Sequence, residues 1–302
     1  MVDHFFNDID TSNTIDGKLV YCLVNQTGLT VNPSTFPDAG SLTIANSTGV
    51  IVENLTLLHS GMGAVFAYTN DSLIRNVAIS NNTGGYGIIV GAGTNNTVSR
   101  CNVSDCFSGV TLSHAINNTV SDNAITNSDH FGVNLWNASL NTIVGNDVLN
   151  SEWTCVYMEG SQNNTFHHNN FVNYSTAYAS GLTNVWDDGY PSGGNYWSGF
   201  NPTDMYHGLY QNETGSDGIG DIRYVINADN ADRYPLVFPY GYVPTPDLNG
   251  DGVIDVLDFG KVALAFGSVP GLHIWNPYID LNQDSIIDIF DLVIIAINFG
   301  KE

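Results

Sequence analysis

The chain has 302 residues, of which 30 are Asp or Glu and only 7 are Lys or Arg, so that its formal net charge is −23. This balance argues against a nucleic acid or an anionic membrane surface as the partner, because both are bound through basic patches. The 43% of apolar residues can bury a core, but no apolar run of 18 or more residues predicts a membrane span. We therefore expect many of the acidic side chains to bind cations or to lie on a solvated surface.

The chain starts without the pattern of a signal peptide, at Met1-Val2-Asp3-His4. Asn-X-Ser/Thr sites nevertheless occur twelve times, which favours an exported protein with a glycosylated surface. We expect an extracellular or cell-surface protein whose leader has been removed, or a fragment of a longer chain. The predicted acceptor asparagines are Asn25, Asn46, Asn54, Asn70, Asn81, Asn95, Asn102, Asn117, Asn137, Asn163, Asn173 and Asn212.

The cysteines form no CxxC motif, which argues against a zinc ribbon or a thioredoxin-type site. They are Cys22, Cys101, Cys106 and Cys155. A disulfide between Cys101 and Cys106 is one alternative in an exported protein. Small buried thiols in a repeat core are the other.

Residues 1–180 are predicted to form the coils of a solenoid, because apolar residues recur every 22 to 24 residues in three registers. The first register is Val52, Ile74, Val98, Val120, Ile143 and Phe166. The second is Leu57, Ile79, Val103, Ile125, Val148 and Phe171. The third is Val65, Ile88, Val110, Val133 and Val156, followed two residues later by Ala67, Val90, Leu112, Leu135 and Met158. Each repeat therefore holds three short strands that send alternate residues inward.

A parallel β-helix fits this pattern better than a leucine-rich repeat, whose L-x-x-L-x-L motif is absent. We expect a mainly β fold, a right-handed parallel β-helix. Residues 1 to about 46 are less regular and are predicted as further coils with an insertion. An asparagine recurs once in each coil, so that the stacked amides can hydrogen-bond from one coil to the next. These residues are Asn96, Asn118, Asn141 and Asn164.

The chain resembles the NosD-like family of periplasmic and archaeal surface β-helices over roughly residues 1–240. The resemblance is carried by the Asn-Asn-Thr coils and by the segments GGNYWSGF and GSDGIGDIRYVINADNADRYPL, between Gly193 and Leu236. The coil pattern is shared with carbohydrate lyases and epimerases, whereas the Gly-Asn-Tyr-Trp and Asp-Gly-Ile-Gly-Asp pair is more specific.

The NosD resemblance raises copper as a ligand, and His167, His168 and the nearby Met158 are suitable donors. The histidines do not share one column, because others occupy different registers: His59, His114 and His130. We therefore predict surface histidines and no copper site.

Catalysis by a lyase, epimerase or glycosidase would require carboxylates gathered on one face of the coils, and lyases usually add a basic residue. The regular coils contain only Arg75 and Arg100. Their acidic residues do not share a register: Asp105, Asp122, Asp129, Asp147 and Glu152. Hydrolysis needs two facing carboxylates, and no pair of neighbouring coils is predicted to supply them. We expect a protein without catalytic residues.

Residues 181–240 are rich in aromatic residues and glycine and are predicted to cap the β-helix, whose last coil would otherwise expose a strand edge. The capping residues would be Trp186, Tyr190, Tyr196 and Trp197. A platform for a glycan is the alternative for the same rings. Asp217 and Asp221 allow either a further calcium site or a tight turn.

Residues 241–246 are predicted as a short, stiff linker to a module over 247–302. The module repeats, after 33 residues, a loop with the oxygen-ligand spacing of an EF-hand. The first loop supplies Asp247, Asn249, Asp251, the Val253 carbonyl, Asp255 and Asp258. The second supplies Asp280, Asn282, Asp284, the Ile286 carbonyl, Asp288 and Asp291. We expect one calcium ion in each loop, more weakly in the second, because Ser285 stands where glycine is preferred.

The module resembles a type I dockerin, because position 12 is Asp in both loops and no helix precedes either loop. This resemblance implies calcium-stabilised docking to a cohesin-like domain. The positions that often carry recognition in that family are apolar here, which argues against a polar contact: Val256, Leu257, Ile289 and Phe290.

Each loop is predicted to lead into an amphipathic helix that ends at Gly267 or Gly300. The expected inner faces are Phe259, Val262, Ala263 and Phe266 in the first helix and Leu292, Ile295, Ala296 and Phe299 in the second. A second apolar stripe on the last helix is expected to bind a partner, with packing on the β-helix as the alternative. Its members are Phe290, Val293, Ile294 and Ile297.

The sequence thus predicts a non-catalytic scaffolding, adhesion or assembly protein that docks through its calcium-stabilised module to a cohesin-like domain or to another copy of itself. Self-docking through a contact that does not close would give filaments. The alternative is a carbohydrate-binding or carbohydrate-active β-helix delivered by the module, and carboxylates gathered on one face of the coils would favour it.

Overall fold

The computed structural model describes residues 9–10, 12–180, 182–215, 217–242, 245–269, 272, 274–276, 278–282, 284 and 286–301. The chain divides into two compact units. The first combines residues 1–200 with 223–235, and the second combines 201–222 with 236–302. The segment predicted as the cap, 181–240, is therefore shared between the two units. Within the described residues, no helix has the length and apolar character needed to cross a membrane.

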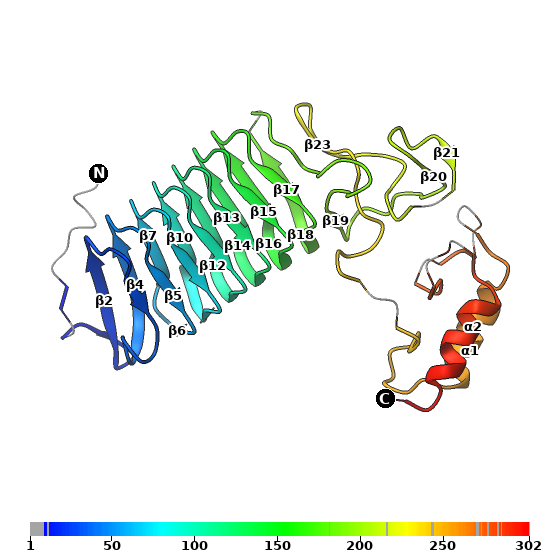
Figure 1. Ribbon diagram of the computed structural model, residues 1–302, viewed down its shortest axis with the longest axis horizontal. Helices are drawn as coiled ribbons and strands as arrows, with labels where there is room; N and C mark the ends of the chain where they lie inside the picture. Colours follow the sequence, from blue (N-terminus) through cyan, green and yellow to red (C-terminus); the bar gives the residue numbers. More distant parts are fainter. Residues whose placement is uncertain are drawn as a thin grey trace. The chain divides into compact units, whose positions relative to one another are not determined.

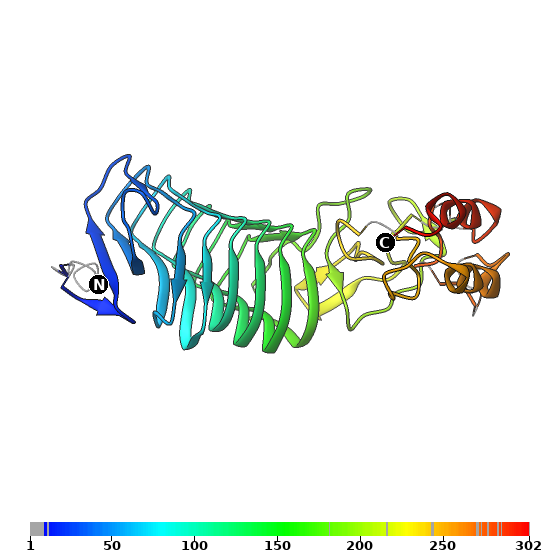
Figure 2. The ribbon, with the colours of Figure 1, turned by 90° about the horizontal axis from the view of Figure 1, so that it is seen from below.

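The first unit is a parallel β-solenoid, whose strands stack along its axis (Figure 1) and follow one another from coil to coil (Figure 2). Its larger sheet consists of β1 (Thr14–Ile15), β2 (Lys18–Val24), β4 (Ala39–Ala45), β6 (Thr56–Leu58), β7 (Met62–Ala67), β9 (Ala78–Ser80), β10 (Asn82–Gly91), β12 (Asn102–Ser113), β14 (Ala124–Trp136), β16 (Asp147–Glu159), β18 (Asn170–Ala179) and β19 (Tyr196–Trp197). Its smaller sheet consists of β3 (Thr30–Val31), β5 (Ile51–Glu53), β8 (Leu73–Arg75), β11 (Thr97–Ser99), β13 (Thr119–Ser121), β15 (Thr142–Val144) and β17 (Thr165–His167). The predicted parallel β-helix is confirmed.

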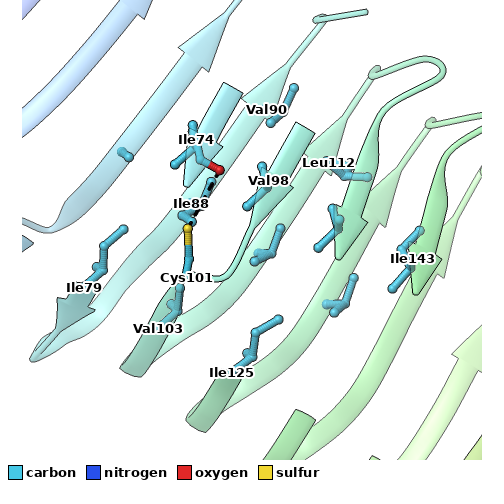
Figure 3. Packing of buried hydrophobic residues seen from close by; sticks show 14 of the residues in the cluster. Ile74, Ile79, Ile88, Val90, Val98, Cys101, Val103, Leu112, Ile125 and Ile143 are labelled. Carbon is cyan, nitrogen blue, oxygen red and sulfur yellow. Dashed lines mark hydrogen bonds between the residues drawn. The ribbon is translucent and has the colours of Figure 1, made fainter. Parts of the chain in front are cut away.

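The predicted first and second apolar registers are correct. Val98 lies opposite Ile74 in parallel pairing, and Val103 lies opposite Ile79 and Ile125. These side chains are almost fully buried and fill the interior of the coils (Figure 3). The core therefore extends along the stack as columns of aliphatic side chains.

The third register is correct from Ile88 onward but was predicted one residue too late in the preceding coil. Ala64, and not Val65, pairs with Ile88. Phe66 pairs with Val90 in the same way. Val65 belongs instead to a separate small apolar cluster. The alternation of a strand allows only every second residue to face the core, so a shift of one residue exchanges the two faces.

The second and third strands of each coil were predicted as separate, but they run together in the later coils. β12, β14 and β16 each pass through both predicted strands without a break. Each of these long strands pairs with the next along most of its length, with an irregularity near Cys106 between β12 and β14. The chain therefore bends within a strand where the sequence predicted a turn.

Cys101 and Cys106 are free thiols in the interior, so the disulfide alternative is not realised. The single thiol proton of Cys101 has two carbonyl acceptors within reach, Ser99 O at 3.4 Å and Ile74 O at 4.0 Å (Figure 3 shows the latter). Burial raises the pKa of Cys101 to about 11 and that of Cys106 to about 12. Both therefore remain protonated core residues at neutral pH.

The predicted asparagine ladder is present in the interior and continues to the end of the stack. Asn96 Nδ2 donates to Asn118 Oδ1 at 3.0 Å, and the same amide contact recurs in each following coil. The ladder passes in order through Asn118, Asn141, Asn164, Asn184 and Asn230. Each of these amides is buried, so the ladder satisfies polar groups that would otherwise be costly inside the coils.

A second interior ladder was not predicted. It runs through Asn123, Asn146, Asn169 and Asn195 and ends on Asp232. The first three asparagines are 23 residues apart, so the coil period contained the signal. The ladder was missed because only the Asn-Asn-Thr positions were aligned.

Both ladders end on the hairpin formed by β22 (Tyr224–Asn227) and β23 (Asn230–Asp232). Trp186 Nε1 donates to Asn230 Oδ1 at 3.1 Å, and Trp197 Nε1 donates to Asp232 Oδ2 at 2.9 Å. The two indoles are buried and lie against aromatic rings of the last coils, Phe166 and Phe171. This packing supports the capping role predicted for the two tryptophans.

We expect Asp232 to make the first unit less stable as the pH rises. Its carboxylate is fully buried, and desolvation raises its pKa from 3.8 to about 7, although Trp197, Asn195 and Tyr234 donate hydrogen bonds to it. The folded state thus favours the protonated acid, so this contribution to stability is complete below pH 3.8 and is lost as the pH rises through 7. The loss amounts to at most about 4 kcal/mol at about 1.4 kcal/mol per pKa unit.

Melting temperatures of the wild type and of Asp232→Asn between pH 4 and 8 measure this effect. The variant should lose the downward slope that the wild type shows in this range. Asp229→Asn, which changes an exposed carboxylate, should keep it. Parallel curves for wild type and Asp232→Asn would contradict the prediction.

The second unit contains β20 (Tyr206–His207), β21 (Glu213–Thr214), α1 (Val256–Ala265) and α2 (Ile289–Asn298). The two helices lie side by side (Figure 1). The glycine that follows each helix donates a backbone hydrogen bond to the loop that precedes the other helix. Gly300 N donates to Ile254 O at 2.8 Å, and 33 residues earlier Gly267 N donates to Ile287 O at 2.8 Å. The sequence duplication is therefore also a duplication of backbone contacts.

The inner helix faces differ in part from those predicted. In α1, Val262 and Ala265 are buried, while Ala263 and Phe266 are exposed. Phe266 leaves helical geometry, with φ −57° and ψ 132°, so its side chain no longer follows the helical period. In α2, Ala296 and Phe299 were predicted on the inner face but are exposed.

Ile294 must be moved from the predicted partner stripe to the inner face of α2. It packs partly against the core of its own module. The inner face follows Asp291, Ile294, Ile295 and Asn298, which are spaced as i, i+3, i+4 and i+7 and are all buried or half-buried. The three other stripe residues remain exposed: Phe290, Val293 and Ile297.

Candidate functional site

The two predicted calcium loops have closely similar hydrogen bonding. In the first, Asp247 accepts the N–H groups of Gly250 and Gly252, and Asn249 Oδ1 accepts that of Asp251. Asp251 and Asp255 accept the N–H groups two residues ahead, from Val253 and Leu257. The corresponding acceptors of the second loop are Asp280, Asn282, Asp284 and Asp288.

The carboxylates at position 12 are the most buried of the predicted ligands. Asp258 is 0% exposed and accepts the N–H groups of Leu248, Asn249 and Asp255. Asp291 does the same in the second loop and is also 0% exposed. Both belong to capping boxes that begin α1 and α2. Each loop is therefore tied to its helix through one carboxylate.

The donor set of both loops fits calcium, because it consists only of hard oxygen atoms. A carboxylate has about four lone-pair positions, so accepting N–H groups leaves capacity for a cation. Among the described residues, however, no three His, Cys, Asp or Glu side chains are grouped so as to hold a metal. The two backbone carbonyls among the predicted calcium ligands belong to exposed residues, Val253 at 42% and Ile286 at 44%. Ser285 lies outside the described residues.

The residues considered for copper do not fit a copper site. Met158 is 0% exposed and belongs to the interior apolar core. His167 Nδ1 lies 3.4 Å from His168 Nδ1, and burial lowers the pKa of His167. Two further histidines are engaged elsewhere, since His59 Nδ1 lies 2.8 Å from Asp16 Oδ2 and His130 stacks on Phe107. The Met158 thioether thus lies in the core and not beside the imidazoles of His167 and His168.

Eleven of the twelve predicted glycosylation asparagines are exposed; the exception is Asn70, which is half-buried. Many occupy corners of the coils with positive φ, such as Asn54 and Asn163 at 57° and 56°. Some amide nitrogens are already donors, as in Asn46 Nδ2 to Asn25 Oδ1 at 2.7 Å. Glycosylation of these sites stays a prediction.

A polar hollow of about 490 Å³ lies on the surface of the coils. It is lined by Asn81, Thr83, Asp105, Asn127, Asp129, Asn150 and Glu152. A second hollow of about 370 Å³ shares two of these residues and continues the depression toward the next coil. It is lined by Asn150, Ser151, Glu152, Asn173, Tyr174 and Ser175. We call the two hollows together the acidic groove.

The acidic groove gathers carboxylates that the sequence analysis placed in unrelated registers. Asp129 and Glu152 are 23 residues apart. The strands β14 and β16 pair with this same offset on both sides of them, at Thr126–Leu149 and at Phe131–Thr154. The two carboxylates are therefore equivalent positions on neighbouring coils, and the prediction that these acidic residues share no register is wrong for this pair.

An exposed asparagine ladder forms one side of the acidic groove. Asn127 Nδ2 donates to Asp105 Oδ1 at 3.2 Å, and Asn150 and Asn173 continue the series at 3.1 Å each. All four residues have φ between 54° and 57°. Asparagine and aspartate tolerate this left-handed conformation, which turns their side chains along the axis of the stack.

Aromatic side chains of the same long strands contact one another in an unbroken series, which we call the aromatic belt. Its members are Tyr86, Phe107, His130, Phe131, Trp153, Tyr157 and Tyr178. Phe107 stacks on His130 at 4.2 Å, and His130 contacts Trp153 edge to face at 5.4 Å. Trp153 is 56% exposed. It directly follows Glu152, which lines both hollows.

The belt and the groove were not predicted, because the period in the sequence was interpreted only as interior apolar registers. Phe107, His130 and Trp153 are each 23 residues apart, which equals the coil step and was a readable signal. An aromatic residue is usually assigned to a core, however, and only the fold decides that these rings face outward. Lys and Arg are absent from the described residues that line the groove.

Comparisons with solved structures found similarity to a periplasmic epimerase. The chain is similar to the crystal structure of the periplasmic alginate epimerase AlgG, with 15% identity and a TM-score of 0.38 over 57% of this chain and 51% of that chain. A double mutant of the same epimerase matches with 15% identity and a TM-score of 0.31, over 51% and 42% of the two chains. The chain thus spans about half the length of these enzymes or less. A search of curated proteins found no match.

The family model for NosD, described as a periplasmic copper-binding protein, matches residues 7–202. The matched segment includes the coils, both interior asparagine ladders up to Asn195, the acidic groove and the aromatic belt. It ends before the loops and helices of the C-terminal module. Since the match covers well over half of the sequence, the chain belongs to the NosD family.

Proposed function

We propose that this protein is an exported β-helix that binds a linear glycan along the acidic groove and the aromatic belt, without transforming it. The observation that carries the proposal is the continuity of the two features over successive coils. Aromatic rings provide flat apolar faces, and the neighbouring asparagines provide amide donors and acceptors. Sites for polar ligands typically combine such a surface with a few placed polar groups.

The direction of the groove favours an extended ligand. Equivalent positions on neighbouring coils are separated by about 4.8 Å, the spacing of strands in a sheet. Asp129 and Glu152 therefore repeat a polar contact at intervals comparable to one sugar residue. His130 and Trp153 repeat an aromatic contact at the same step. A ligand that lies along the stack meets the same pair of groups on successive coils.

We expect Trp153→Ala to weaken glycan binding by about tenfold or more, because base or sugar stacking on an exposed ring contributes on the order of 1–3 kcal/mol. The ring is 56% exposed, so its removal should leave the fold intact. Titration calorimetry with a panel of linear hexasaccharides measures the effect. Tyr210→Ala is the matched control, since that ring is 80% exposed and belongs to the second unit.

Wild-type affinity of Trp153→Ala for every hexasaccharide bound by the native protein would contradict the proposed site. Failure of the native protein to bind any member of the panel would remove glycan binding as its function.

A glycoside hydrolase is the competing function for the same groove, and the Asp129–Glu152 pair on neighbouring coils favours it. New reducing ends should appear on incubation with the bound glycan if it holds. They should vanish in both Asp129→Asn and Glu152→Gln. We expect no such release, since the proposed function is binding without transformation.

We further propose that the C-terminal module binds two calcium ions and docks the protein to a cohesin-like domain or to another copy of the chain. The proposal is supported by the duplicated loops and by the exposure of three stripe residues. Phe290 is 59% exposed, Val293 47% and Ile297 67%. Apolar side chains gathered on one helix of a small module are typical of an interaction surface.

We expect Val293→Lys combined with Ile297→Lys to abolish docking or self-assembly while calcium binding persists. Two buried charges in the contact would each cost more than the apolar area they replace. Sedimentation of the native chain and of the variant, with calcium and after its removal by EDTA, measures assembly. Lys301→Ala is a control outside the stripe. Unchanged assembly of the double variant would exclude the stripe as the docking surface.

A further inference from the structure

Building on the calcium binding proposed above, we propose that the segment after each helix of the C-terminal module positions a carbonyl ligand in the calcium loop that precedes the other helix. The carbonyl oxygens of Ser268 and Lys301 are the positioning groups. Each loop is then complete only when both helices are in place. An ion in one loop therefore raises the affinity of the other loop for calcium.

The first loop is held by the chain that follows α2. Ile254 O accepts a hydrogen bond from Gly300 N at 2.8 Å, and Ile254 N donates to Lys301 O at 3.1 Å. This N–H belongs to the same peptide unit as the Val253 carbonyl, the predicted ligand at position 7 of the loop. A trans peptide is planar, so its N–H and its C=O point in opposite directions. The bond to Lys301 therefore fixes the direction of the Val253 carbonyl.

The second loop is held in the same way by the chain that follows α1. Ile287 O accepts a hydrogen bond from Gly267 N at 2.8 Å, and Ile287 N donates to Ser268 O at 3.0 Å. The Ile287 N–H shares its peptide unit with the Ile286 carbonyl, the ligand at position 7 of this loop. Ile287 is 0% exposed, and a buried backbone N–H needs a partner. The pairing with Ser268 therefore holds the Ile286 carbonyl in one direction.

Hydrogen bonds within each loop leave these carbonyls free to turn. Asp251 Oδ1 accepts the N–H of Val253 at 2.9 Å, and Asp284 Oδ1 accepts that of Ile286 at 2.9 Å. Each of these N–H groups belongs to the peptide unit before the ligand carbonyl. The backbone can still rotate about ψ between the two units. The hydrogen bond from beyond the other helix is thus what orients the ligand.

Each helix connects the loop before it to the backbone pairing after it. Asp258 belongs to the capping box of α1 and accepts three N–H groups of the first loop. Asp291 has the same role between the second loop and α2. Both helices have ten residues, a length that is marginal in water without contacts at the ends. A loop without its ion would hold its helix less firmly, and the pairing after that helix would weaken as well.

Calorimetric titration of the EDTA-stripped full chain with calcium chloride tests the coupling in a matched pair of variants. Asp251→Ala removes the carboxylate at position 5 of the first loop, and Asp284→Ala removes its equivalent 33 residues later. Each variant then gives the binding constant of its intact loop. We expect the overall constant for two ions in the native chain to exceed the product of the two single-loop constants by about tenfold.

Removal of residues 300–302 tests the positioning role. The chain that ends at Phe299 keeps every predicted ligand but lacks the pairing with Ile254. Calcium binding by the first loop, measured together with Asp284→Ala, should weaken by about fivefold or more. Binding by the second loop, measured together with Asp251→Ala, should stay unchanged, although the deletion lies directly after α2. Lys301→Ala keeps the backbone carbonyl and should leave both constants unchanged.

An overall constant equal to the product of the single-loop constants would overturn the coupling and leave calcium binding in place. A deletion that weakens the second loop as much as the first would show that residues 300–302 only stabilise α2, which would overturn the positioning role. Absence of calcium binding by the native chain would contradict both the positioning role and the calcium binding on which it rests.

Discussion

Val133→Asp is expected to unfold the first unit at room temperature. Val133 is 0% exposed, and its parallel neighbours Val110 and Val156 are 0% exposed as well. A carboxylate at this position would be buried among aliphatic side chains with no donor nearby. If the new carboxyl group remained protonated, it would carry no charge. It would still lack a hydrogen-bond partner and would leave a gap in the column of aliphatic side chains. We expect a loss of about 4 kcal/mol or more.

Far-ultraviolet circular dichroism during thermal and urea unfolding measures this loss. Trp136→Asp is the matched control, because Trp136 lies on the same strand and is 43% exposed. That variant should keep a melting temperature close to that of the native protein. A native melting curve for Val133→Asp would mean that the third register is misplaced in this coil.

Asn146→Leu is expected to destabilise the first unit almost as strongly, although leucine is the more hydrophobic residue. Asn146 is 0% exposed and lies in the middle of the second interior ladder. Its Nδ2 donates to Val120 O, Val144 O and Asn169 Oδ1, and its Oδ1 accepts both the backbone and the side-chain N–H of Asn123. Leucine would leave several of these groups buried without partners. The expected loss is roughly 3–5 kcal/mol.

Urea unfolding midpoints of the native protein and of Asn146→Leu give the size of the effect. Asn150→Gly serves as the control, because Asn150 belongs to the exposed ladder and its φ of 57° suits glycine. Its loss should stay below about 1 kcal/mol, since exposed amides can bond to water instead. Equal losses in the two variants would show that burial of the interior ladder does not increase its contribution to the free energy of unfolding.

Most of the coil architecture could be predicted because parallel stacking repeats the same environment for each equivalent residue. Val98 and Val120 occupy equivalent positions, so selection for a buried aliphatic side chain acts on both, and the period appears in the sequence. The error at Val65 has the same origin. Short strands contain apolar residues on both faces, and only the pairing of Ala64 with Ile88 distinguishes them.

The duplicated loops and their helices were likewise readable from spacing, because capping by Asp255 and Asp288 is a local interaction. Which helix face is buried was less readable. Ile294 and Val293 are adjacent and both apolar, and only the packing of the module's core decides that Ile294 turns inward. A helix that is apolar on most sides carries no pattern that identifies its inner face.

By itself, the sequence determined the parallel β-helix, the first interior asparagine ladder and the duplication of the C-terminal module, because each depends on a period along the chain. The tertiary structure alone decided that the two ladders end on Asn230 and Asp232, since the hairpin that carries them lies about two coil lengths further along the chain. It also decided that Asp129, Glu152 and Trp153 form one outward face. Outward positions need no particular residue type for folding, so their chemistry becomes visible only when the coils are stacked and the side chains from different repeats lie together.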